Sequence, residues 1–279
     1  MYTEFIHEYL LMGHMKQVPE ECSEKPVYYM PHHAVLRPDS TTTKLRVVFD
    51  ASCRTSTGLS LNDALMVGPV VQDPLLAMLV RFRLHRIAAV ADVAKMYRMV
   101  LTQPGDHPLH KIVWRDSKEE PIKIFELTTV TYGTASAPYL ATRCLKKLGE
   151  DCATTHPVAS DVILHDFYVD DMLSGADNIK EAKLLVKQVE EVTNSAGFIL
   201  RKWNSNSPEL LRSIPKKMRD DRSVLDLQSS STTVKTLGLQ WNVTADEFQF
   251  SFPQWKSDAA SITKRSIHSD AACFLTLWD

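Results

Sequence analysis

The sequence predicts an α+β fold, and three observations support this. Hydrophobic residues make up 44% and charged residues 24% of the 279 residues, which is typical of a globular protein that folds around its own core. Residues 87–91 form a short, continuous apolar run of buried-strand length that ends in Asp92. From there to Trp203, the patterns indicate strand, helix, strand, strand, helix, strand, which is the split βαβ order of ferredoxin-like folds.

Shorter elements precede this unit. Residues 1–25 predict a helix followed by a polar link, and extended segments follow at 27–30 and 45–49. A helix is predicted over 74–84, with Asp73 placed to cap it and proline at its first position.

The βαβ unit contains an inserted hairpin, and its first and third strands are neighbours in this topology. We therefore expect Asp92 and the Asp170-Asp171 turn to meet at one edge of the sheet. The other expected segments are the hairpin strands 111–114 and 122–127, a helix from 136, strands at 162–168 and 172–173, a helix capped by Asn178 and ended by Gly197, a strand at 198–203, a loop over most of 204–233, a hairpin at 234–241 and 248–252, and a helix from 255.

Charge and cysteine content limit the partners and the compartment. The 32 basic and 34 acidic residues give a net charge of −2, so any site for a polyanion must be a local patch. The five cysteines are odd in number and far apart, without zinc-finger spacing, so we expect a reduced, intracellular chain without structural zinc. No apolar run approaches the roughly eighteen residues of a membrane span, and no signal-peptide pattern is present.

Three carboxylates at one sheet edge suit two Mg²⁺ ions, because hard cations prefer oxygen ligands. Two ions roughly 3.5–4 Å apart can activate an attacking oxygen and stabilise a leaving oxygen, which indicates phosphoryl transfer. Adjacent aspartates are also common in ordinary turns. Their place on a strand-turn-strand, downstream of the strand-ending Asp92, favours the metal site.

Two short motifs resemble those of reverse transcriptases. Tyr168-Val169-Asp170-Asp171 resembles their YxDD box, and Asp92-Val93 followed by Tyr97 resembles their upstream aspartate motif. Within that family the chain looks similar to Bel/Pao-type LTR retrotransposons over roughly residues 1–270. Further matching stretches lie at 44–51, 133–138, 198–203 and 235–238.

The resemblance implies a right-hand polymerase: an RNA- and DNA-directed DNA polymerase that extends a primer with dNTPs and two Mg²⁺, with Mn²⁺ as a substitute. Residues 1–25 would be an N-terminal helix and link, and 26–90 the fingers, with an insertion at 108–133. Residues 91–252 would be the palm and 253–279 the start of a truncated thumb. The expected partners are an RNA or DNA template with its primer and dNTPs, with no membrane, in the cytoplasm. The oligomeric state is left open.

The resemblance also implies a role for each matched residue. Asp92, Asp170 and Asp171 would be catalytic metal ligands, joined by the main-chain carbonyl of Val93. The nucleotide would contact Lys44, Arg46, Tyr97, Gly133 and Lys202, with Tyr97 as a gate against the ribose 2′-hydroxyl and Lys202 near the place of a general acid. Primer and template would contact Tyr168, Pro138, Leu237 and Gly238, and their phosphates would draw on Arg81, Arg83, Arg86, Lys146, Lys147, Lys216, Lys217, Arg219, Lys264 and Arg265.

Plainer interpretations stay open at this point. Tyr97 would equally suit a core tyrosine, Arg46 a solvated strand end and Gly238 an ordinary hairpin glycine. Tyr132 stands where retroviral enzymes carry a glutamine. The whole chain could be an inactive, truncated retroelement remnant that binds nucleic acid or metal without polymerising, or an RNA-dependent RNA polymerase with the same metal geometry.

Overall fold

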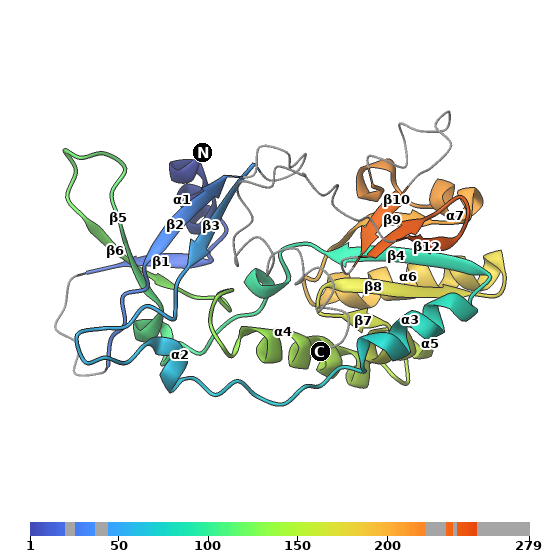
Figure 1. Cartoon of the computed structure of the whole chain (residues 1–279), viewed down its shortest axis with the longest axis horizontal. Coiled ribbons are helices and arrows are strands. Elements are labelled where there is room, and N and C mark those ends of the chain that lie inside the picture. Colours follow the sequence, from blue (N-terminus) through green and yellow to red (C-terminus); the bar gives the residue numbers. More distant parts are fainter. Residues whose placement is uncertain (20–25, 37–43, 221–232, 237–238, 250–279) are drawn as a thin grey trace, which may run out of the picture.

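The chain forms two lobes that are joined along one side by helix α4 (Ala137–Asp151), as the computed structural model shows (Figure 1). We call residues 1–64 with 101–132 the first lobe, and residues 75–100 with 137–249 the second lobe. The structure describes residues 1–19, 26–36, 44–220, 233–236 and 239–249.

The first lobe packs helix α1 and two small antiparallel sheets around one core. The sheet β1-β6-β5 contains the predicted hairpin β5–β6, and the second sheet pairs β2 with β3. Buried Ile6 and Tyr9 of α1 meet Phe49, Ile112 and Leu127 in this core. The elements are α1 (Tyr2–Leu11), β1 (Met15–Val18), β2 (His32–Leu36), β3 (Leu45–Phe49), α2 (Leu61–Ala64), the 3₁₀ helix η2 (His107–His110), β5 (Lys111–Trp114) and β6 (Lys123–Leu127).

The second lobe is built on the antiparallel sheet β7-β8-β4-β9, which confirms the split βαβ order expected from the sequence. A smaller sheet, β10-β11-β12, follows it. The elements are α3 (Leu75–Leu84), β4 (Ile87–Val93), η1 (Met96–Met99), α4, α5 (Pro157–His165), β7 (Phe167–Tyr168), β8 (Asp171–Ala176), α6 (Ile179–Ser195), β9 (Leu200–Ser205), α7 (Pro208–Ser213), η3 (Lys216–Met218), β10 (Thr233–Thr236), β11 (Leu239–Asn242) and β12 (Glu247–Gln249).

Strand β4 is apolar along its length because both of its faces are covered. Ala89 and Ala91 pack into the core that α4 and α6 share, whereas Ala88 and Val90 pack against Phe82 of α3 on the other face. A strand buried on both faces has no alternating pattern. This burial explains the continuous run that predicted the strand.

Three local predictions are wrong. The strand expected at 27–30 makes a single bridge, Tyr29 with Lys111, and the strand itself begins at His32. The strand expected at 162–168 is helical up to His165, since a short apolar run does not distinguish a strand from a buried helix. Asp73 does not cap α3, because its carboxylate pairs with Arg81 instead.

The C-terminal part is also more regular than expected. Segment 204–220 contains the end of β9 and helix α7, and the strand expected at 234–241 is two paired strands, β10 and β11, with β12 added beside them. The thumb expected at 253–279 lies outside the described residues, as do Cys22 and Cys273.

The described residues bear on the expected state of the cysteines and on membrane spans. Their cysteines, Cys53, Cys144 and Cys152, are all free thiols. None of the helices in these ranges is long and apolar enough to cross a membrane.

Candidate active site

Asp92 and Asp171 lie directly opposite each other on the neighbouring strands β4 and β8. Since side chains alternate along a strand, Asp92 shares a face with Ala88 and Val90, and Asp171 shares that face with Leu173. Both carboxylates therefore project from one face at the same end of the sheet. The meeting of Asp92 with the acidic turn, expected from the topology, is confirmed by this register.

The acidic turn between β7 and β8 is held in a strained conformation. Val169 has a φ of 53°, which is unfavourable for a β-branched residue and is the kind of strain found at functional sites. Two hydrogen bonds fix the turn: the amide of Val169 donates to Oε1 of Gln72 at 2.9 Å, and the amide of Val93 donates to the carbonyl oxygen of Asp170 at 2.8 Å.

A β-bulge brings two consecutive cations to Asp92. Between the pairs Asp92–Arg201 and Val90–Asn204, strand β9 has one residue more than β4, and Lys202 there has a φ of 53°. Consecutive side chains of a regular strand point to opposite faces, but a bulge can redirect one. The ammonium of Lys202 lies 2.6 Å from Oδ2 of Asp92, and Nε of Arg201 lies 3.7 Å from Oδ1.

The three carboxylates interact strongly with one another. Burial, together with the charges of Asp170 and Asp92, raises the pKa of Asp171 to about 7. Burial and the charge of Asp92 also raise the pKa of Asp170. Crowded, desolvated carboxylates of this kind are typical of functional sites and respond to a nearby cation.

The donor set fits a hard divalent cation. Oδ1 of Asp92 is buried and accepts no hydrogen bond, and the other donors at this edge are also carboxylate oxygens. Within the described ranges, no three histidine, cysteine, aspartate or glutamate side chains already converge as a finished metal site. The Lys202 ammonium beside Asp92 supplies positive charge where a cation would be expected.

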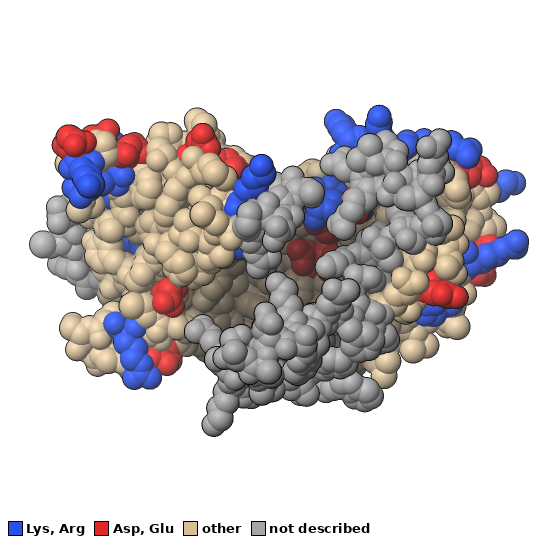
Figure 2. Space-filling model, turned by 45° about the horizontal axis from the view of Figure 1, so that its top comes forward, with Lys and Arg blue, Asp and Glu red and all other residues tan. Residues whose placement is uncertain are grey.

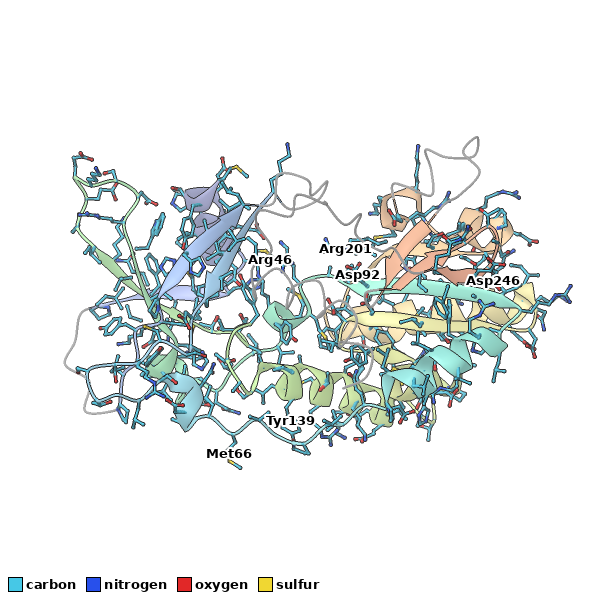
Figure 3. All side chains as sticks on the ribbon, in the orientation of Figure 1. Arg46, Met66, Asp92, Tyr139, Arg201 and Asp246 are labelled. Carbon is cyan, nitrogen blue, oxygen red and sulfur yellow. The ribbon has the colours of Figure 1, made fainter. Side chains whose placement is uncertain are left out.

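A cavity of about 720 Å³ opens between the two lobes, and of the three carboxylates Asp170 lines it, while Asp92 and Asp171 lie outside its lining. It brings together four residues predicted for the site: Lys44, Arg46, Tyr97 and Asp170. Figure 3 shows Arg46 on the first lobe facing Arg201 and Asp92 on the second. In Figure 2, acidic atoms lie deep in the hollow, with basic atoms on both sides. Such a cavity suits an anionic ligand that also carries a metal ion.

Other predicted residues lie elsewhere. Gly133 and Pro138 are exposed residues outside the lining of this cavity. Tyr168 is half-buried and pairs with Asp171 across the hairpin. Leu237 and Gly238 lie outside the described residues.

Sequence reasoning missed several residues of the cavity wall. Helix α1 showed no chemical motif, yet it lines the cavity through Glu8, among others, and Lys95, Arg98 and Arg201 add positive charge. The available signal was the basic pair Lys95 and Arg98 on either side of Tyr97.

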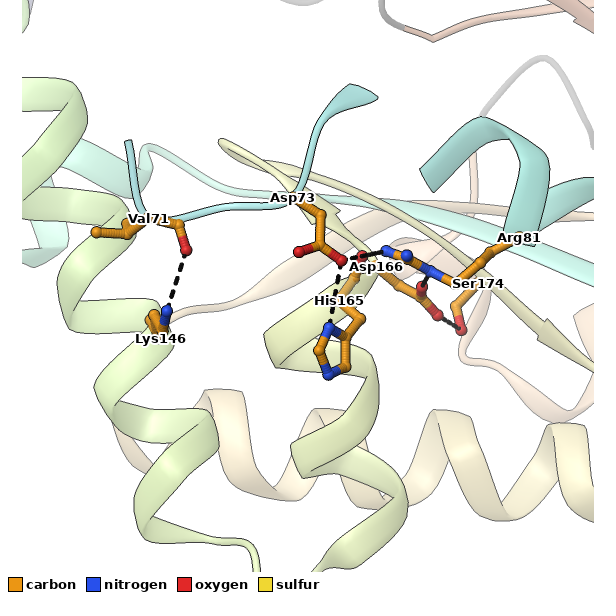
Figure 4. A network of polar contacts seen from close by, with 7 residues as sticks. All are labelled: Val71, Asp73, Arg81, Lys146, His165, Asp166 and Ser174. Carbon is orange, nitrogen blue, oxygen red and sulfur yellow. Dashed lines mark hydrogen bonds and ion pairs between the residues drawn. The ribbon is translucent and has the colours of Figure 1, made fainter. Parts of the chain in front are cut away.

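A polar network fixes the base of the acidic hairpin to α3 (Figure 4). Asp166, just before β7, accepts from Arg81 Nε at 3.2 Å and from the Ser174 hydroxyl at 2.6 Å. Arg81 also pairs with Asp73, and Lys146 donates to the carbonyl of Val71. Several basic residues expected to contact template thus have partners within the protein: Arg81, Arg83 with Asp246, Lys146, Lys147 with Asp151, and Arg219 with main-chain carbonyls, while Lys264 and Arg265 lie outside the described residues.

Replacing Gln72 by Met should lower any metal-dependent activity of the site by about tenfold. The substitution keeps the side chain's size but removes the acceptor that holds the Val169 amide in the strained turn. Gln188→Met is the matched control, because Gln188 Oε1 likewise accepts from a main-chain amide, that of Ala159, away from the carboxylates. Steady-state rates and thermal melts of both variants check this. Equal activity losses in the two variants would remove the special role of Gln72.

Comparisons with known proteins identify a family and a fold for the chain. Residues 41–240 match the family model described as reverse transcriptase (RNA-dependent DNA polymerase). No curated protein sequence matches the chain.

Two similar solved structures are the native protease-reverse transcriptase of prototype foamy virus and its selenomethionine-labelled CSH mutant, both with a TM-score of 0.53. The first is 16% identical and the match covers 88% of this chain and 25% of that one; the second is 17% identical, with 70% and 22% covered. The chain thus spans about a quarter of the length of these proteins, and the likeness shows a shared mixed α/β fold. Because the family model matches well over half of its residues, this chain belongs to the reverse transcriptase (RNA-dependent DNA polymerase) family.

Proposed function

We propose that this chain is the DNA polymerase domain of a Bel/Pao-type retroelement, which copies RNA or DNA by extending a primer with dNTPs. The observation that carries the proposal is the gathering of Asp92, Asp170 and Asp171 beside a cavity lined with cations from both lobes. In this proposal the first lobe supplies most of the fingers and the second lobe the palm.

The three carboxylates, with the main-chain carbonyl of Val93, would hold two Mg²⁺ ions, or Mn²⁺ in their place. When bound, such ions activate the attacking oxygen of the primer and stabilise the leaving pyrophosphate. The unbonded, buried Oδ1 of Asp92 and the raised pKa of Asp171 support this assignment, since both favour the approach of positive charge.

The residues around the cavity would bind and orient the nucleotide. Lys44 and Arg46 are exposed at the start of β3 and would hold the triphosphate, for which the guanidinium fork of arginine is well suited. The half-buried ring of Tyr97, close to Asp170, would exclude a ribose 2′-hydroxyl. Lys202 would donate a proton to the leaving pyrophosphate.

The remaining matched residues are proposed to contact the template–primer duplex, because they match reverse transcriptase motifs. Tyr168, at the end of β7 next to the carboxylates, would touch the primer end. Pro138, Leu237 and Gly238 would contact primer and template. Gly133 would keep the chain beside the nascent base pair close to β3.

Primer extension on poly(rA)/oligo(dT) with dTTP and Mg²⁺ tests the proposal. We expect extension with RNA and DNA templates, preference for dTTP over rUTP, and loss of activity in Asp92→Asn. Asp161→Asn, an exposed carboxylate on α5, is the control and should extend normally. A folded wild-type chain that extends no primer with Mg²⁺ or Mn²⁺ would contradict the proposal and favour an inactive remnant, whereas preference for rUTP would favour an RNA polymerase.

A further inference from the structure

Helix α1 forms one wall of the cavity, although it precedes the region that matches the family model. Met1, Glu4, Phe5 and Glu8 of this segment line the cavity together with residues of the second lobe. The opposite face of α1, with Ile6 and Tyr9, is buried in the core of the first lobe. Core packing thus holds the buried face of the helix, and its other face presents acidic and aromatic groups to the cavity.

Glu8 connects this helix with the turn that carries Tyr97. Its carboxylate accepts from the ammonium of Lys95 and lies 3.2 Å from the guanidinium of Arg98. Burial opposes ionisation, but the hydrogen bonds and charges of these two cations lower the pKa of Glu8 overall. Lys95 begins the turn with a φ of 55°, so the segment is held in a conformation that its own sequence disfavours.

Arg98 is the more deeply held of the two cations, with 7% of its surface exposed. Its guanidinium stacks 4.0 Å from the ring centre of Tyr9, and its Nε donates to Nδ1 of His14 at 3.0 Å. Glu8 supplies the negative charge in this group. A buried guanidinium without its anion is strongly unfavourable, so loss of the Glu8 charge should shift the turn rather than leave Arg98 in place.

Tyr97 lies between these two anchored residues and lines the cavity together with Asp170. Burial, and then the charge of Asp170, raises the pKa of the tyrosine. We propose that Glu8 is a positioning residue for nucleotide selection: by holding Lys95 and Arg98, it fixes the Tyr97 ring against the cavity. The inference rests on the proposed function, and it assigns to α1 a part in choosing deoxynucleotides.

An isolated surface ion pair would be a weaker interpretation of the same contacts. Exposed pairs contribute little to stability, because solvent screens them and holding two long side chains in place costs entropy. The pair Lys183–Glu209, at 2.8 Å on α6 and α7, is of that kind, and its glutamate also has a lowered pKa because of the lysine. Glu209→Gln therefore provides a matched control for Glu8→Gln.

The test measures kcat, KM and the preference for dTTP over rUTP on poly(rA)/oligo(dT). Glu8→Gln should raise the KM for dTTP about fivefold and reduce the preference about tenfold, with kcat changed less than about twofold. Glu209→Gln should match the wild type. Identical KM and preference in the two variants would overturn the inference while leaving the proposed function intact.

A second measurement does not depend on polymerisation. Binding of a fluorescent N-methylanthraniloyl dTTP to the full chain in Ca²⁺ should weaken in Glu8→Gln and not in Glu209→Gln. If the wild type extends no primer, this comparison still decides: weaker binding in Glu8→Gln supports the role of Glu8, and equal or absent binding overturns it. Thermal melts of both variants verify that they are folded.

Discussion

Asp171→Asn is expected to abolish primer extension, by about a thousandfold or more, while making the folded chain more stable. Activity is lost because one of the oxygen ligands proposed for Mg²⁺ becomes a neutral amide. Stability rises because partial burial of Asp171, together with the charges of Asp170 and Asp92, raises the pKa of this carboxyl to about 7. The site thus holds carboxylates that oppose folding unless a cation is bound.

The sign of the pH effect follows from this raised pKa. Below the ordinary value of 3.8, Asp171 is protonated in both folded and unfolded chains and has no effect on stability. As the pH rises from there to about 7, only the unfolded chain loses its proton easily, so the wild type loses stability. At pH 8 the variant should be more stable by on the order of 2 kcal/mol, after a discount for solvent screening, and at pH 4 its advantage should shrink to about 0.5 kcal/mol or less.

Urea unfolding of Asp171→Asn and the wild type in EDTA at pH 4 and pH 8 checks the predicted gain in stability. Primer extension in Mg²⁺ checks the predicted loss of activity. Asp161→Asn should change neither quantity, because that carboxylate is exposed. A variant that is inactive but no more stable at pH 8 would show that the carboxylates are not crowded as described. A variant that stays active would remove Asp171 from the proposed ligands.

Gly133→Ala is expected to destabilise the chain by about 3 kcal/mol, the second large effect. Gly133 has a φ of 98°, and a Cβ there would lie 2.3 Å from the carbonyl oxygen of Phe49. That oxygen belongs to β3, whose Phe49 side chain is part of the core of the first lobe. The substitution therefore forces the backbone of two packed segments apart.

Gly197→Ala separates the effect of the positive φ from the effect of the steric clash. Gly197 has a φ of 80° at the end of α6, but no atom lies within 4 Å of the position of its Cβ. The free energy of unfolding of Gly197→Ala should fall by about 1 kcal/mol because of backbone strain alone. Urea unfolding of the two variants and the wild type measures the free energies of unfolding that this comparison needs. An equal loss in both would contradict the steric role of Gly133.

The sequence predicts the central sheet and its acidic edge because each depends on local signals. An apolar run ending in Asp92, a tight acidic turn and two predicted helices indicate the strand order, and this order brings Asp92 to the same sheet edge as the acidic turn. The pairing register of β4 with β8 then sets Asp92 opposite Asp171. Helix α5 was missed because its apolar residues have no pattern that separates it from a strand.

The surroundings of the carboxylates depend on contacts between distant segments. Lys202 reaches Asp92 only because β9 has an extra residue, and no turn signal marks a bulge formed by lysine. The partners of Arg98 lie more than eighty positions away, in α1 and just after it. Gln72 likewise approaches Val169 from across the fold. Sequence patterns indicate local periodicity, and they carry no signal for these contacts between residues that are far apart in the chain.

The most direct test of the central claim is the binding of Mn²⁺ to the full chain, followed by electron paramagnetic resonance. The carboxylate edge described above predicts saturable Mn²⁺ binding that Mg²⁺ displaces, that disappears in Asp92→Asn and Asp170→Asn, and that persists in Asp161→Asn. Mn²⁺ binding that is absent from the wild type, or that is the same in all four proteins, would contradict it.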